Sequence, residues 1–165
     1  MVQNPLGLVL PYVEFRATNI TGAAVSRGDI LNVHIDAAVT AGLSPFQQVD
    51  YPASGVIDAG DDASALYVVA LEDAAIGAEL QVCAKSGGVQ VLVDATCASV
   101  AAGGVGNGLI PVGTSTNKGM IQAKDGTAGT SFKVIAKILE EFTTGNPALK
   151  MAAFDGINGF GPALS

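Results

Sequence analysis

Apolar and polar side chains alternate with a period of two in several short stretches of the chain. The stretch YVEFRAT, residues 12–18, places Val13, Phe15 and Ala17 on one face and polar residues on the other. The stretch ILNVHID, which begins at Ile30, repeats this alternation. Because successive side chains of a β-strand point to opposite faces, both stretches are predicted to be strands with one buried face.

Further strand signals follow along the chain. The segment ALYVVAL, residues 65–71, is apolar at both faces, which predicts a strand buried on both sides. The alternating stretches AELQVCAK and VQVLVDA flank Ser86-Gly87-Gly88, and a Gly-Gly pair in that position predicts a hairpin turn. Shorter strand candidates cover residues 109–112, 120–123 and 148–154.

The segment SFKVIAKILEEF, residues 131–142, fits two periods. A helical stripe and a strand face can both be drawn starting from Phe132. A near-repeat favours the strand, because the phrase VALED that starts at Val69 and the phrase KILEE that starts at Lys137 are each followed, after three residues, by Gly. The first phrase has the pattern of a strand that enters an acidic turn, so we predict the same for the second.

About eight or nine short strands separated by turns predict a mainly β fold, a small β-barrel or sandwich with long loops and little helix. We expect an N-terminal arm over residues 1–12, a single β domain over residues 13–155 and a Gly-rich C-terminal tail over residues 156–165. Residues 37–65 form an unusually long connection, which we interpret as an interaction loop or as a segment with a short helix near Pro45–Val49.

Composition and charge exclude several classes of partner. The chain of 165 residues is 49% hydrophobic and 14% charged, with a net charge of −7 and only eight Lys and Arg residues. Nucleic acids and anionic membranes are recognised by clustered basic residues, so neither is expected as a partner. The start of the chain lacks a signal-peptide pattern, and no apolar run is long enough to span a bilayer. We therefore expect a soluble protein, made in a cytoplasm, with Cys83 and Cys97 reduced.

Few side chains are placed for chemistry. His34 is the only histidine, and although Asp36 shares its face, no local motif supplies a nucleophile. One histidine and two distant cysteines match no zinc spacing, and the acidic cluster at residues 58–62 lacks the spacing of a calcium loop. The Gly-rich residues 103–108 match neither the dinucleotide fingerprint nor a Walker loop, and the tripeptide Arg27-Gly28-Asp29 is interpreted as a turn. We expect no catalytic residue, no metal site and no cofactor.

An ordered series of phrases carries a resemblance to a known family. The series consists of SRGDILNV, YVVALEDAAIGAELQV, SGGVQVLVDA, a Gly-rich stretch and KVIAKILEEFTTG, and it covers roughly residues 26–145. It resembles the small capsid decoration, or cement, proteins of tailed bacteriophages. The sequence departs from that pattern in the longer insert at residues 37–65 and in a more apolar N-terminal arm, and both departures leave the docking mode open.

The resemblance implies a β-barrel-type fold, no catalysis, and frequent trimers seated on symmetry axes of the viral shell. It implies that the chain binds the assembled major capsid protein on the outer surface of the virion and stabilises the head, after synthesis in the host cytoplasm. The alternative is a phage tail or fibre-associated β module, or another surface-assembly β module. For partner binding we predict Leu6, Leu8, Leu10 and Tyr12 of the arm, which pack either against a neighbour or against their own domain.

Overall fold

The structure is a computed structural model, and it describes residues 2–3, 9–33, 47–52, 66–93, 108–111, 119–123, 134–140 and 147–160. Within these ranges the chain forms strands and turns, and no α-helix is present there. The prediction of a mainly β fold is therefore confirmed. The strands are β1 (Val2–Gln3), β2 (Val9–Leu10), β3 (Val13–Asn19), β4 (Ile30–Val33), β5 (Gln48–Asp50), β6 (Tyr67–Ala70), β7 (Glu79–Val93), β8 (Gly108–Pro111), β9 (Ile121–Ala123), β10 (Ala136–Ile138) and β11 (Ala148–Asp155).

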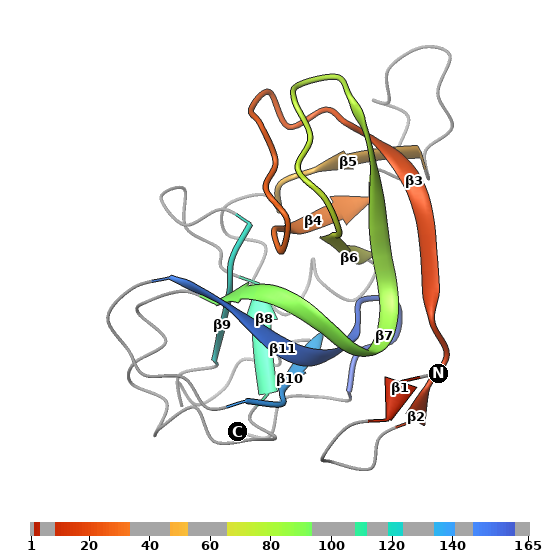
Figure 1. The fold of residues 1–165 in the computed structure, drawn as a ribbon, viewed down its shortest axis with the longest axis vertical. Coiled ribbons are helices and arrows are strands. Elements are labelled where there is room, and N and C mark those ends of the chain that lie inside the picture. The colour runs from red at the N-terminus through yellow and green to blue at the C-terminus, as the bar shows by residue number, and fades with distance from the viewer. Residues whose placement is uncertain are drawn as a thin grey trace, which may run out of the picture.

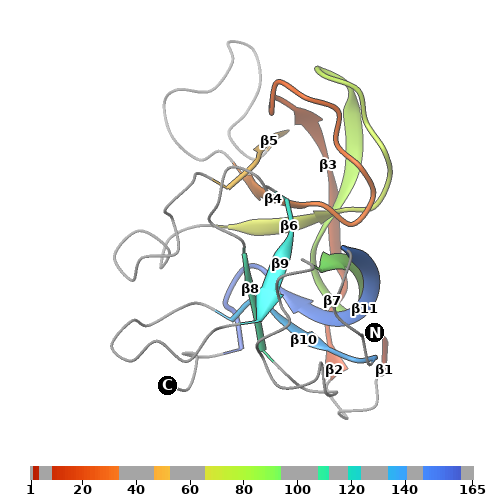
Figure 2. The same cartoon turned by 90° about the vertical axis from the view of Figure 1, so that its left-hand side faces the viewer.

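The long strand β7 is shared by two rings of paired strands (Figure 1). Its first half pairs with β3 at one edge and with β6 at the other, and β5 and β4 complete the first ring. Its second half pairs with β11 and β9, and β10 and β8 complete the second ring. Figure 2 shows the strands of the first ring above those of the second. The strand β7 thus joins the two halves of the molecule.

The hairpin predicted at Ser86-Gly87-Gly88 is wrong, because β7 continues through these residues over 15 positions. The two glycines are not among the residues with positive φ, which a two-residue hairpin turn requires. Opposite them, the register of β11 shifts between Ala152 and Phe154, so that β7 carries one extra residue there. The glycines form a β-bulge, and the Ser86 hydroxyl stabilises it through hydrogen bonds with the N–H and C=O of Gly88 at 3.1 and 3.0 Å.

Each ring encloses its own apolar core, and β6 contributes to both. Val68 and Ala70 face the core of the first ring, whereas Tyr67 and Val69 face the core of the second. All four residues of β6 are buried, as the apolar run in the sequence predicts. The first core contains Ala17, Val25, Leu31, Val33, Val49, Val68, Ala70, Ala74, Leu80, Val82 and Ala84. The second contains Ile30, Tyr67, Val69, Val89, Val91, Val93, Ile121, Ile135, Ala136, Ile138, Ala152 and Phe154.

The long connection at residues 37–65 contributes a strand that the sequence did not indicate. The strand β5 pairs in parallel with the end of β3 and antiparallel with β4. For the short helix expected near Pro45–Val49, residues 45 and 46 lie outside the described residues and Gln47 is in a 3₁₀ turn, whereas Gln48 and Val49 belong to β5, so the expectation is wrong at those two residues. The strand interpretation of residues 131–142 is confirmed at β10, and the predicted strands near residues 109–112, 120–123 and 148–154 are confirmed as β8, β9 and β11.

Candidate interaction surface

The N-terminal arm begins with two short strands that pair with each other. Val2 lies opposite Leu10 in this antiparallel pair, and both β1 and β2 contact β7. Of the residues predicted to bind a partner, Leu10 is half-buried, Tyr12 is 47% exposed, and Leu6 and Leu8 lie outside the described residues. Partner binding by these four residues stays a prediction.

Tyr12 combines an exposed aromatic ring with a hydrogen bond to a nearby carboxylate. Its hydroxyl donates to a carboxylate oxygen of Glu14, two residues further along the chain. This hydrogen bond, together with partial burial, raises the pKa of Tyr12 to about 12. The phenol is therefore neutral at physiological pH, and tyrosines with an exposed ring and an anchored hydroxyl are enriched at protein interfaces.

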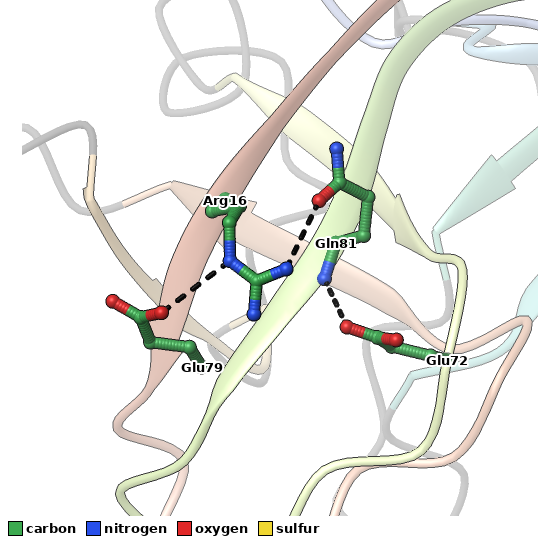
Figure 3. Close-up of polar contacts among 4 residues, drawn as sticks. All are labelled: Arg16, Glu72, Glu79 and Gln81. Atoms are coloured by element: carbon green, nitrogen blue, oxygen red, sulfur yellow. Dashed lines mark hydrogen bonds and ion pairs between the residues drawn. The ribbon is translucent and has the colours of Figure 1, made fainter.

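Polar side chains from β3 and β7 form a network on the outer face of the sheet, which we call the β3–β7 face (Figure 3). Gln81 donates to Glu14 at 2.9 Å, and the Arg16 Nε donates to Glu79 at 3.3 Å. A second nitrogen of Arg16 reaches Gln81 at 3.5 Å. The side chains of Arg16 and Glu79 are 58% and 67% exposed, so their ion pair contributes at most about 1 kcal/mol to stability. The face is ordered, polar and accessible to a partner.

The corner between β6 and β7 is closed by one residue of β7. The N–H of Leu71 donates to the carbonyl of Gln81 at 2.9 Å, and the N–H of Gln81 donates to the Glu72 carboxylate at 2.8 Å. Beyond these contacts, Ile76 at the tip of the corner is 64% exposed. Glu72 is therefore a backbone acceptor that fixes the corner.

The corner after β10 uses the same two contacts. The N–H of Leu139 donates to the carbonyl of Met151 at 2.9 Å, and the N–H of Met151 donates to the Glu140 carboxylate at 2.8 Å. Lys150 lies 3.9 Å from the same carboxylate group. The near-repeat of the sequence is thus a repeated structural unit, one copy in each ring, which supports the interpretation of these acidic residues as corners.

Asp29, directly before β4, and Tyr51, directly after β5, form a hydrogen-bonded pair in which Asp29 is buried and Tyr51 is half-buried. The Asp29 carboxylate accepts from the Tyr51 hydroxyl and from the N–H of Ser26, both at 3.0 Å. Burial raises the pKa of Asp29 above 3.8, and burial and the nearby Asp29 charge raise the pKa of Tyr51. Because Asp29 is only 6% exposed, the tripeptide that begins at Arg27 is a turn that cannot present this carboxylate to a receptor.

Lys85 and Asp155 form an ion pair where the two rings meet. Their charged atoms are 3.0 Å apart, and their side chains are only 16% and 6% exposed. The second oxygen of Asp155 accepts from the N–H groups of Ile157 and Asn158 at 3.1 and 2.9 Å. Removing one partner of such a pair leaves a charge without compensation, so the pair holds the end of β11 against β7.

The remaining candidates for chemistry are inert or lie outside the described residues. Cys83 is fully buried with a free thiol, and burial raises its pKa to about 11, so the reactive thiolate is suppressed. In the described ranges, no group of three His, Cys, Asp or Glu side chains could hold a metal ion. Those ranges also contain no helix that is long and apolar enough to cross a membrane. The structure does not describe His34, Cys97 or the acidic cluster at residues 58–62.

The fold has a counterpart among solved structures. The chain is similar to the crystal structure of the N base of head fiber gp8.5 in bacteriophage phi29, with a TM-score of 0.50 and 17% sequence identity. The similarity covers 90% of this chain and 98% of that chain. At this identity the likeness shows a shared fold. No protein-family model matches the chain, and no curated protein sequence matches it.

Proposed function

We propose that the chain is a structural protein of a bacteriophage virion that decorates the head. The observation that carries the proposal is the fold shared with the base of a phage head fiber, because it extends over nearly the whole length of both chains. The ordered phrases from SRGDILNV to KVIAKILEEFTTG support the same class, since they resemble those of capsid decoration proteins. In this proposal the major capsid protein is the partner and the outer surface of the head is the location.

A decoration protein of this kind acts by binding only the assembled shell. A ligand that binds the assembled lattice, and not its free subunits, stabilises the lattice by mass action. We propose that three copies bind together, since simultaneous contacts raise the overall affinity without any new type of contact. The arm residues Leu6, Leu8, Leu10 and Tyr12 are proposed as the apolar part of the contact.

The proposed role needs neither catalysis nor a cofactor. The described polar groups support it, because Glu72 and Glu140 accept backbone hydrogen bonds at corners and Asp155 is held by Lys85. An acidic protein with a net charge of −7 also stays soluble at the high local concentration of a shell surface.

Co-sedimentation with heads tests the proposal. The purified chain is mixed with heads assembled from the major capsid protein of the same genome and, separately, with unassembled capsid subunits. We expect the chain to sediment with the heads and to stay in solution with the subunits. Tyr12→Ala should weaken retention, whereas Ile76→Ala, which removes another exposed apolar side chain, should not. Failure of the unmodified chain to bind heads would refute the proposal.

A fibre-associated β module is the second candidate. It is supported by the same likeness, because the similar structure is described as the base of a head fiber. Electron microscopy of the purified chain separates the two candidates. Elongated assemblies in the absence of heads would favour the fibre module, whereas compact trimers that bind heads would favour the decoration protein.

A further inference from the structure

The backbone of β3 directs some of its hydrogen-bonding groups away from β7. Gln81 uses its N–H and its C=O for the corner on the β6 side, so it has none left for β3. Arg16 lies opposite Gln81 in the register of β3 and β7. In an antiparallel pair such residues are non-hydrogen-bonded, so the N–H and C=O of Arg16 point to the opposite edge of β3.

The end of β3 gives the same alternation independently. The N–H of Asn19 donates to Ala78 on the β7 side, whereas the N–H of Ile20 donates to Val49 of β5 on the opposite side. Even-numbered residues of β3 therefore present their backbone groups to the β5 edge. By this alternation Glu14 does so as well, since the register from Glu14 to the end of the strand is continuous.

Most of this edge has no strand beside it among the described residues. The strand β5 pairs only with Thr18 and Asn19, and no described strand pairs with the same edge over Val13–Ala17. Figure 1 shows β3 along the right-hand side of the molecule, with β7 on its inner side. An exposed edge of this kind is a template for an added strand.

The side chains along this edge are complementary in charge to those of a second copy of β3 that runs in the opposite direction. If a second β3 pairs antiparallel about Phe15, Glu14 of each copy lies opposite Arg16 of the other copy. The residues with outward backbone groups are then opposite each other, as hydrogen-bonded pairs must be, and the two Phe15 residues form the central non-hydrogen-bonded pair. Both requirements, charge and hydrogen-bond alternation, are met by the same register.

We infer that the β3 edge is an association site for a second copy of this chain, in an antiparallel two-fold pairing centred on Phe15. The added strand also covers Val13 and Phe15, which are apolar, half-buried and packed against the first core. Isolated charges on an edge strand normally prevent such pairing. Here the opposite charges of Glu14 and Arg16 make the edge attract its own copy, because opposite charges directly across a ladder stabilise it.

The inference does not depend on the proposed function. A contact about a two-fold axis differs from the three-fold contact of a trimer, so the edge would join one trimer to the next. The ladder is only five residues long and ends where β5 begins, so the association is expected to be weak and to strengthen where many copies are held close together.

Charge exchange across the edge tests the inference. Sedimentation equilibrium at low salt is measured for the full chain and for Glu14→Lys, Arg16→Glu and the double exchange. Each single variant places like charges opposite each other twice, and we expect association to weaken about tenfold. The double variant restores both pairs and should restore association. Arg27→Glu makes the same charge change as Arg16→Glu at an exposed position of the turn before β4, away from the edge, and should leave association unchanged.

Mixing provides the decisive measurement. Lys at position 14 of one variant lies opposite Glu at position 16 of the other, and the native Glu14 and Arg16 residues form the second pair. The two single variants should therefore associate with each other although neither associates with itself. Circular dichroism verifies that every variant is folded. Three results would each overturn the inference: unchanged association in the single variants, no recovery of association on mixing, or an unmodified chain that forms no two-fold dimer. None of these results would bear on whether the chain binds heads.

Discussion

Gly156 lies where the end of β11 passes between β6 and β7, and replacing it with alanine tests how the rings are joined. The N–H of Gly156 donates to the carbonyl of Ala84 at 3.0 Å, and its carbonyl accepts from the N–H of Tyr67 at 3.1 Å. A Cβ atom at this position would lie 1.9 Å from the carbonyl oxygen of Tyr67 and 2.6 Å from its carbonyl carbon. The obstruction is backbone, so no side-chain rotation relieves it.

The expected loss of stability follows from these contacts. To admit the methyl group, β6 and the end of β11 must separate by about an ångström, and at least one of the two backbone hydrogen bonds is lost. Leaving a buried donor and acceptor unpaired costs about 1–3 kcal/mol, and overpacking adds about 1–3 kcal/mol. We therefore expect Gly156→Ala to lower the free energy of unfolding by about 2–6 kcal/mol. For a chain of this size the midpoint of thermal unfolding should fall on the order of 10 °C.

Calorimetry and urea unfolding measure the effect, and Gly22→Ala is the matched control. Gly22 has a φ of 76° with open space around its added Cβ, so alanine there meets only the backbone penalty of about 1–2 kcal/mol. If Gly156→Ala were no more destabilising than Gly22→Ala, the close packing of β11 against β6 would be wrong.

Two further predictions concern buried titratable groups. Because burial raises the pKa of Asp29 in the folded state above 3.8, the folded chain binds a proton that the unfolded chain has lost, and stability falls as pH rises through the folded pKa. The unfolding midpoint of the unmodified chain should therefore decline relative to Asp29→Asn as the pH is raised above about 4, and parallel pH profiles would contradict this. In a Cys97→Ser variant, the buried Cys83 thiol should react with an aromatic disulfide reagent only as fast as the chain opens, and rapid labelling at pH 8 without denaturant would show that the thiol is accessible.

The strands and their faces were predictable because their signals are local. In β3 the alternation of Val13, Phe15 and Ala17 with polar residues needs no knowledge of partner strands, and the structure has the polar residues Glu14 and Arg16 exposed. The two-sided apolar run of β6 likewise predicted burial on both faces. The two matching corners were visible as a near-repeat, since each corner requires a Glu directly after a Leu.

The bulge in β7 shows where local signals fail. A Gly-Gly pair between alternating stretches suits a tight turn, and it suits equally well a long strand that must bend. Pairing with β11 decides between the turn and the bent strand, because Ala153 of β11 lies opposite the glycines. This partner lies more than 60 positions away in the sequence. The strand β5 was missed for a related reason, because three residues with a buried Gln48 carry no alternation of their own.

Only part of the β3–β7 face could be predicted from the sequence. The outward position of Glu14 and Arg16 follows from alternation, but their contacts with Gln81 and Glu79 depend on the register between two strands about 65 positions apart. The free edge of β3 could not be predicted from the sequence, because it depends on which strands do not pair with β3. Such features are set by topology, which a single sequence specifies only through long-range packing.

Two buried polar side chains of the described residues, Asn19 and Asp155, have their polar atoms occupied by contacts within the fold. The Asn19 side chain is fully buried, donates to the carbonyls of Ala23 and Ala75 at 2.8 and 3.1 Å, and accepts from the Thr21 N–H at 2.9 Å. Asp155 likewise divides its two oxygens between a cation and the turn after β11. A catalytic side chain keeps a reactive atom free to face a substrate. These two groups are instead occupied in holding one segment of the chain against another, so their polar atoms serve the stability of the fold.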